Sequence, residues 1–170
     1  NLESGLRGVP VGYCTTSSVD PQLGLFYAGY PIAELAHKEP EEIIYLLFNL
    51  ELPNPEQLSE FKQQLIAHSK INPEVFKHLE ILPKSGHPMK WFLHGLNALG
   101  MHSGTGDYKK DAINIVAQLP ELVAAIYRIR SGWGDLIESK PELGYMENFV
   151  AMVNPPNGSK LAFLLPAKEA

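Results

Sequence analysis

The fold is decided by the longest helical pattern in the chain, which runs from Asp107 to Arg130 and reads DYKKDAINIVAQLPELVAAIYRIR. Its apolar residues recur at helical spacing but cover more than one face: Ile113, Ile115, Val116, Leu119, Leu122, Val123, Ile126 and Ile129. A helix that is apolar on several faces must be buried against other elements. Pro120 predicts a kink because it removes one backbone donor. The segment 131–134, which reads SGWG, predicts the end of the helix.

Further helical patterns lie upstream of this run. Residues 41–50 are apolar on nearly every face, which predicts a buried helix that Leu52-Pro53 ends. Asn54 and Asn72 are each followed by Pro and, two or three residues on, by Glu or Gln. Asn is a favoured helix cap and Pro a favoured first residue, so two more helices are predicted to start there.

Two helical patterns flank the long run. After a loop at 83–88, the apolar stripe from Met89 to Gly100 predicts a helix, in which Gly95, Ala98 and Gly100 favour close approach of a second helix. A last helical piece is expected over about 145–153.

The N-terminal region has a β pattern. Two short β-rich runs within residues 8–30 surround a turn at Asp20-Pro21, which predicts a small hairpin. The predicted fold class is mainly α with a short N-terminal β-hairpin.

The composition favours a globular protein. The chain has 170 residues, of which 45% are hydrophobic and 19% charged, and its net charge is −5. Without a long basic run, capture of nucleic acid is not expected. The longest apolar stretches, Ile43–Phe48 and Leu161–Leu165, are far shorter than a membrane span, so no membrane partner is expected. Cys14 is the one cysteine, which favours a reducing compartment, and we expect a cytoplasmic protein.

The N-terminus lacks the basic-then-apolar pattern of a signal peptide. It also lacks an initiator Met, which favours a processed or excised piece.

The sequence offers no clear catalytic or metal site. His87, His94 and His102 follow each other at intervals of seven and eight residues, a rise of about 10–12 Å, which is too far for one zinc ion. His68 and His78 belong to different helices without a third ligand nearby in sequence. We therefore expect no metal ligands and interpret the histidines as packed or solvated. Cys14 is interpreted as a small core residue rather than a nucleophile.

The glycine-rich stretch 104–106 resembles the start of a phosphate loop. No strand precedes it and a Lys-Ser/Thr pair is missing, so it is interpreted as a loop before a helix capped by Asp107.

Several short motifs that follow each other in a fixed order are more specific than any one of them alone. It comprises Gly5–Val9, Thr15–Asp20, Gly24–Ala36, Glu41–Leu47 with Leu52-Pro53, His87–Met89, Ala117–Pro120, Ala124–Arg128 and Glu147–Phe149. In this order they resemble the N-terminal, large-domain part of the citrate synthase family. The resemblance covers about residues 5–153, so we expect one large-domain region over 1–153 and a divergent tail over 154–170.

The resemblance implies an activity for the parent enzyme. The family condenses acetyl-CoA, or propionyl-CoA in 2-methylcitrate synthases, with oxaloacetate, using a catalytic Asp and His. Those residues lie in later segments that read like GPLHGGA and GFGHRVY, which this chain lacks. The resemblance therefore implies no catalytic residue here, and we expect inactivity without the missing half. Whether the chain is itself an enzyme stays open.

One binding residue is carried over by the resemblance. Arg7 lies in a Gly-x-Arg-Gly motif that some family members use against a phosphate of CoA, although a solvated turn arginine is an equal alternative. CoA thioester would be a substrate, and no cofactor is expected in this chain.

The resemblance also implies partners. The helices expected over 88–102 and 107–130 correspond to those that pack across the family's dimer interface, so a homodimer is expected. A separate C-terminal half or a full-length enzyme is the other expected partner. The alternative function is a non-catalytic helical module for binding or dimerisation.

Overall fold

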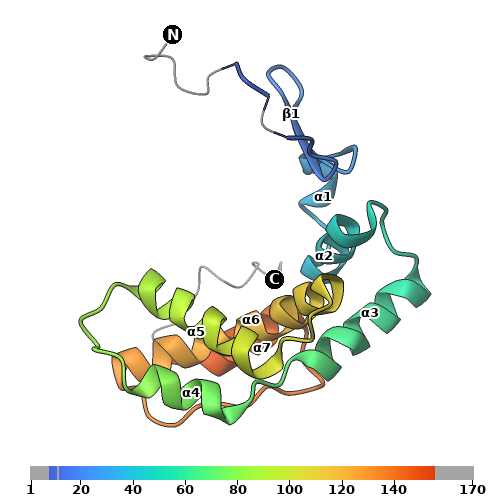
Figure 1. Cartoon of the computed structure of the whole chain (residues 1–170). Coiled ribbons are helices and arrows are strands. Elements are labelled where there is room, and N and C mark those ends of the chain that lie inside the picture. Colours follow the sequence, from blue (N-terminus) through green and yellow to red (C-terminus); the bar gives the residue numbers. More distant parts are fainter. Residues whose placement is uncertain (1–7, 11, 156–170) are drawn as a thin grey trace. The chain divides into compact units, whose positions relative to one another are not determined.

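The computed structural model describes residues 8–10 and 12–155. Seven helices and three short strands lie within them (Figure 1). The mainly helical prediction is confirmed. The chain divides into two compact units, Asn1–Leu58 and Ser59–Ala170.

The first unit begins with a small antiparallel sheet. Strands β1 (Ser17–Asp20) and β2 (Gly24–Tyr27) pair directly, and β3 (Tyr30–Pro31) pairs with the other edge of β2. The carboxylate of Asp20 accepts the backbone N–H groups of Leu23 and Gln22, both at 2.8 Å, which closes the predicted turn. These two bonds lower the pKa of the Asp20 carboxyl from its ordinary value.

The sheet differs from the predicted hairpin in two respects. Ala28 and Gly29 both have positive φ, 47° and 88°, so a two-residue hairpin turn adds β3. Alanine rarely adopts this conformation, which is why the sequence did not predict the turn. The described residues before Ser17 form no strand, because β1 extends only as far as its pairing with β2, which ends at Tyr27.

Two helices follow in the first unit, α1 (Ile32–Leu35) and α2 (Pro40–Asn49). The prediction that α2 is buried on nearly every face is wrong. Leu46 is fully buried, but Leu47 and Phe48 keep more than a third of their surface in solvent. The sequence shows which faces are apolar but not which neighbours cover them.

The remaining helices are α3 (Pro55–His68), which begins in the first unit, α4 (Pro73–Glu80), α5 (Pro88–Ser103), α6 (Tyr108–Ser131) and α7 (Tyr145–Val153). Their predicted start signals are confirmed. Asn54 and Gln57 exchange two side chain–backbone bonds of 2.9 Å. The side chain of Asn72 accepts from the N–H of Glu74, and that of Asp107 accepts from Lys109, each at 3.0 Å.

The core of the second unit lies where α4, α5 and α6 pack together. Its buried residues are Ile71, Val75, Leu79, Trp91, Ala98, Leu99, Leu122 and Ile126. Each large apolar side chain among them contributes about 1.5–3 kcal/mol by leaving water. A second cluster joins Ala124 of α6 to Met152 and Val153 of α7. The multi-faced apolar pattern of α6 thus corresponds to burial on two sides.

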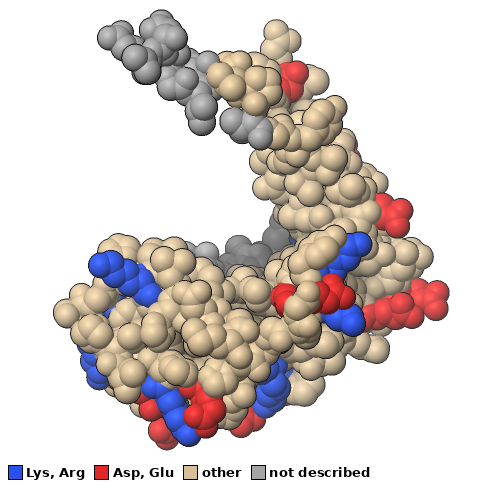
Figure 2. All heavy atoms as spheres, viewed as in Figure 1, with Lys and Arg blue, Asp and Glu red and all other residues tan. Residues whose placement is uncertain are grey.

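Helix α6 is also long and apolar enough to cross a membrane, judged by length and composition alone. The central helix of a soluble protein passes the same test, so this does not indicate a membrane protein. On the face shown in Figure 2, Lys and Arg side chains are interspersed with Asp and Glu.

Helix α6 continues through Pro120, which lacks an N–H group. The carbonyl of Val116, four residues earlier, therefore lacks its intrahelical donor. The hydroxyl of Tyr145 donates to this carbonyl oxygen at 2.7 Å. Because Tyr145 is the first residue of α7, the bond fixes the start of α7 against the middle of α6.

The buried side chain of Arg128 holds the other end of α7. Its guanidinium donates to the carbonyl oxygens of Trp133 (2.7 Å), Asp135 (2.7 Å), Val153 (3.1 Å) and Asn154 (3.0 Å). One side chain thereby joins α6, the loop after it and the end of α7.

We predict that replacing Tyr145 by Phe lowers the free energy of unfolding by about 1 kcal/mol, because the Val116 carbonyl loses its donor. In a Pro120→Ala background the cost should fall by about 0.5–1 kcal/mol, since the alanine introduced there supplies the helical N–H. Urea unfolding of the four chains measures this coupling. Tyr108→Phe, at a residue that is 77% exposed, serves as the control and should change little. If Tyr145→Phe costs the same free energy in both backgrounds, the Tyr145 hydroxyl does not replace the donor that Pro120 lacks.

Candidate functional site

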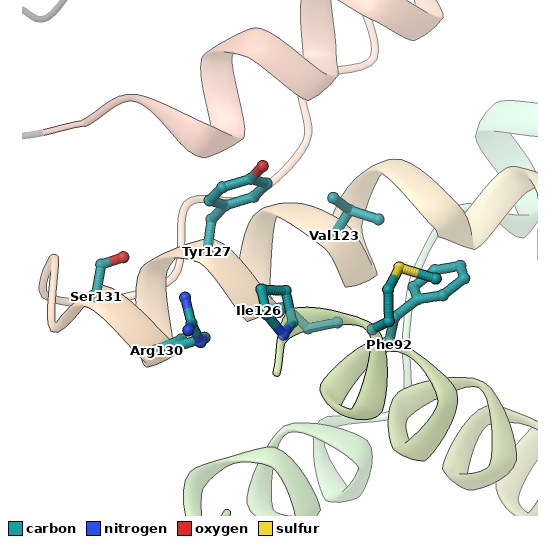
Figure 3. A pocket seen from close by; sticks show the side chains of 8 residues that line it. Phe92, Val123, Ile126, Tyr127, Arg130 and Ser131 are labelled. Atoms are coloured by element: carbon teal, nitrogen blue, oxygen red, sulfur yellow. The ribbon is translucent and has the colours of Figure 1, made fainter. Parts of the chain in front are cut away.

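An apolar groove lies between α5 and α6 (Figure 3). It encloses about 330 Å³ and is lined from both helices by Pro88, Met89, Phe92, Val123, Ile126, Tyr127, Arg130 and Ser131. Ile126, which belongs to the core that α6 shares with α4 and α5, also lines the groove.

Close packing of α5 on α6 forms the floor of the groove. Gly95 is buried, and a Cβ atom there would lie 2.8 Å from Cδ1 of Leu122. The predicted close approach at Gly95 is therefore confirmed, and it is made within this chain. At Gly100, which is exposed, no neighbouring atom lies within 4 Å of an added Cβ, so the approach of a second helix there stays a prediction.

Two hydrogen bonds between side chains and the backbone fix the start of α5, which lines one end of the groove. The N–H of Met89 donates to Nδ1 of His87 at 3.2 Å, which caps the helix. Nε of Arg130 donates to the carbonyl of Gly86 at 3.3 Å, which ties the end of α6 to the loop before α5. The ring of Tyr127 stacks on that of Trp133, with 6.4 Å between centroids.

The lining suits binding rather than acid–base chemistry. Met89 and Tyr127 are 55% and 52% exposed, so large apolar surfaces face solvent. Among the described residues that line the groove, polar groups come from Tyr127, Arg130 and Ser131, and none is a carboxylate, thiol or imidazole. An apolar partner carrying a few acceptors would match this surface.

The residues singled out from the sequence do not converge on the groove. Arg7 lies outside the described residues, as do residues 156–170 of the tail.

Cys14 is exposed, so its interpretation as a core residue is wrong. Hydrogen bonds from the side chains of Ser17 and Thr16 lower the pKa of its thiol to about 6. Cys14 lies before β1, which starts at Ser17 and is itself mostly exposed.

The loop before α6 behaves as predicted. Asp107 caps the helix, and the carboxylate of Asp111 accepts the hydroxyl and the N–H of Thr105 at 2.7 and 2.8 Å. These bonds lower the pKa of the Asp111 carboxyl.

Three histidines that sequence spacing left apart lie together. His78 of α4 lies beside His94 and His102 of α5, with ring centroids 6.2 and 5.5 Å away. Within the described residues, no three His, Cys, Asp or Glu side chains are placed to hold a metal as they stand. The proximity depends on the packing of α4 against α5, which spacing within one helix does not reveal.

The family model described as citrate synthase, C-terminal domain, matches residues 5–164. The chain belongs to the citrate synthase family. The match continues beyond Val153, the last residue of α7.

Curated relatives include two kinds of enzyme. The chain is 37% identical over 161 residues to citrate synthase 2 of Bacillus subtilis (strain 168), covering 88% of this chain and 42% of the relative. It is 30% identical over 161 residues to 2-methylcitrate synthase 2 of Corynebacterium glutamicum, covering 90% and 42%. The chain thus spans less than half the length of these relatives.

Solved structures of citrate synthases also match this chain. The citrate synthase of Thermotoga maritima MSB8 has a TM-score of 0.77 at 30% identity, covering 89% of this chain and 41% of that one. The Thermoplasma acidophilum citrate synthase, solved with carboxymethyl coenzyme A and oxaloacetate, has a TM-score of 0.80 at 19% identity, covering 90% and 42%. At that identity the likeness concerns the fold alone.

We predict that Gly95→Ala lowers the free energy of unfolding by about 1–3 kcal/mol, because its methyl group overlaps Leu122 in a packed core. Gly100→Ala is the matched control on the same helix and should raise stability by about 0.5–1 kcal/mol, since Ala is the better helix former and the site is open. Denaturant unfolding of both variants checks this. Equal effects would mean that α5 and α6 are not in close contact at Gly95.

Proposed function

We propose that this chain is the N-terminal, large-domain helical portion of a cytoplasmic citrate synthase, which condenses acetyl-CoA with oxaloacetate. The family match over residues 5–164 carries the proposal. The TM-score of 0.77 at 30% identity supports it, since the helical scaffold agrees along with the sequence.

In this proposal the chemistry belongs to protein that this chain does not contain. The groove between α5 and α6 offers no acid–base pair among its described lining residues. The histidine- and arginine-bearing segments expected from the family resemblance are not in the sequence. The chain would act as a scaffold and be inactive alone.

The acyl donor has two candidates. Relatives named 2-methylcitrate synthase, from Corynebacterium glutamicum and Mycobacterium tuberculosis, are 30% and 32% identical to this chain. Propionyl-CoA is therefore the alternative donor. Arg7 remains the candidate for contacting a CoA phosphate.

The groove and the helices that form it, 88–102 and 107–130, are proposed as a homodimer interface. Its exposed apolar residues would leave water on association, and a two-fold axis would set the same groove of each copy against the other. A non-catalytic module for dimerisation would use this same surface.

We predict that the chain sediments as a dimer, at twice the 18.9 kDa of one copy. Met89→Asp and Tyr127→Asp should each shift it to monomer, because a carboxylate would be buried without a partner. Sedimentation equilibrium measures the mass, and circular dichroism confirms that the variants stay helical.

Ile81→Asp, at an apolar residue that is 80% exposed and lies outside both helices of the proposed interface, is the matched control and should remain dimeric. A wild-type chain that stays monomeric at high concentration would exclude the dimer without bearing on family membership.

We predict no release of CoA thiol from acetyl-CoA and oxaloacetate by the chain alone. Turnover should appear when the part of Bacillus subtilis citrate synthase 2 that this chain does not match is co-expressed with it. That part expressed alone is the control, and propionyl-CoA is tested in parallel.

Turnover by the chain alone would overturn the assignment of the chemistry to the missing part. A dimer that forms a complex with the added part but gives no turnover would favour the non-catalytic module.

A further inference from the structure

The imidazoles of His78 and His102 face each other across the contact between α4 and α5. Their Nε2 atoms lie 3.3 Å apart. Both residues are exposed, so ions in solution can reach them, whereas His94 beside them is half-buried. None of the three lines the groove between α5 and α6.

The separation of these two nitrogens matches a shared metal. Zinc binds imidazole nitrogen at about 2.0–2.1 Å in tetrahedral geometry, which places two ligand nitrogens about 3.3–3.4 Å apart. A direct hydrogen bond also fits the distance, but only if one ring donates from Nε2 while the other accepts there. A cation between two neutral rings satisfies both acceptors at once.

An ion pair lies close to His78 in sequence. Glu74 lies one helical turn before His78 and forms an ion pair of 2.6 Å with Lys77. The pKa of the Glu74 carboxyl is lowered chiefly by Lys77, with smaller contributions from His102 and His78. Because Lys77 already balances the charge of this carboxylate, the two imidazoles would supply the protein ligands of the ion.

His94 takes a different place. It lies eight residues before His102 on α5, a rise of about 12 Å, so those two rings cannot share an ion directly. His78 lies between them, and its ring is closer to His102 than to His94. The pair is therefore His78 with His102.

We propose that His78 and His102 bind one divalent cation of the zinc class through their Nε2 atoms, with water in the remaining positions. The ion links α4 to α5 and stabilises their packing. Imidazole ligands select zinc, copper or nickel over magnesium. Binding requires each ring to present an unprotonated Nε2 atom to the ion.

The test titrates zinc chloride into the full chain by calorimetry. All chains carry Cys14→Ser, because the exposed Cys14 thiol, with its pKa of about 6, is a competing zinc ligand. One zinc per chain is expected. His78→Ala and His102→Ala should each weaken binding by at least about tenfold, since even groups that only orient a ligand cost 10–100-fold.

Zinc should also raise the melting temperature of the parent chain, and this rise should vanish in both variants. His37→Ala, at an exposed histidine of the first unit, is the matched control and should keep full affinity. His102→Gln repeats the test with a milder change, and circular dichroism confirms that each variant folds.

Absence of zinc binding to the parent chain would overturn the proposal. So would unchanged affinity in the two histidine variants, or equal binding of magnesium. None of these outcomes bears on the proposed citrate synthase function, which this site does not use.

Discussion

The second unit depends on the buried guanidinium of Arg128, which donates hydrogen bonds to backbone carbonyl oxygens. Four carbonyls around Arg128 come from the loop after α6 and from the end of α7. Bonds to a charged donor are stronger than neutral ones, and a buried guanidinium left without acceptors would be very costly. The chain therefore has to bring residues 133–135 and 153–154 to one point, which fixes the path between the two helices.

The apolar residues of α6 pack against different neighbours on different sides of the helix. Leu122 and Ile126 complete the core with α4 and α5, and Ala124 meets Met152 and Val153 of α7. Val123 and Tyr127 line the groove between α5 and α6. Part of the apolar surface of α6 is therefore covered by α4, α5 and α7.

Periodicity and capping residues were enough to predict α3, α4 and α6, because Asn54, Asn72 and Asp107 act within one turn of their own position. The contact of Gly95 with α6 was also predictable, since only a small residue permits it. The histidine pair was not, because His78 and His102 meet through the packing of two helices. The turn at Ala28 was also not predictable from the sequence, because alanine seldom takes positive φ.

The proline in α6 has a consequence for how the second unit opens. A helix with every carbonyl paired internally can keep its hydrogen bonds when its neighbours detach. Here the carbonyl of Val116 is served by a hydroxyl from α7, so detachment of α7 exposes an unpaired acceptor in the middle of α6. We therefore expect the two helices to open as one cooperative unit, with their amides exchanging with deuterium together.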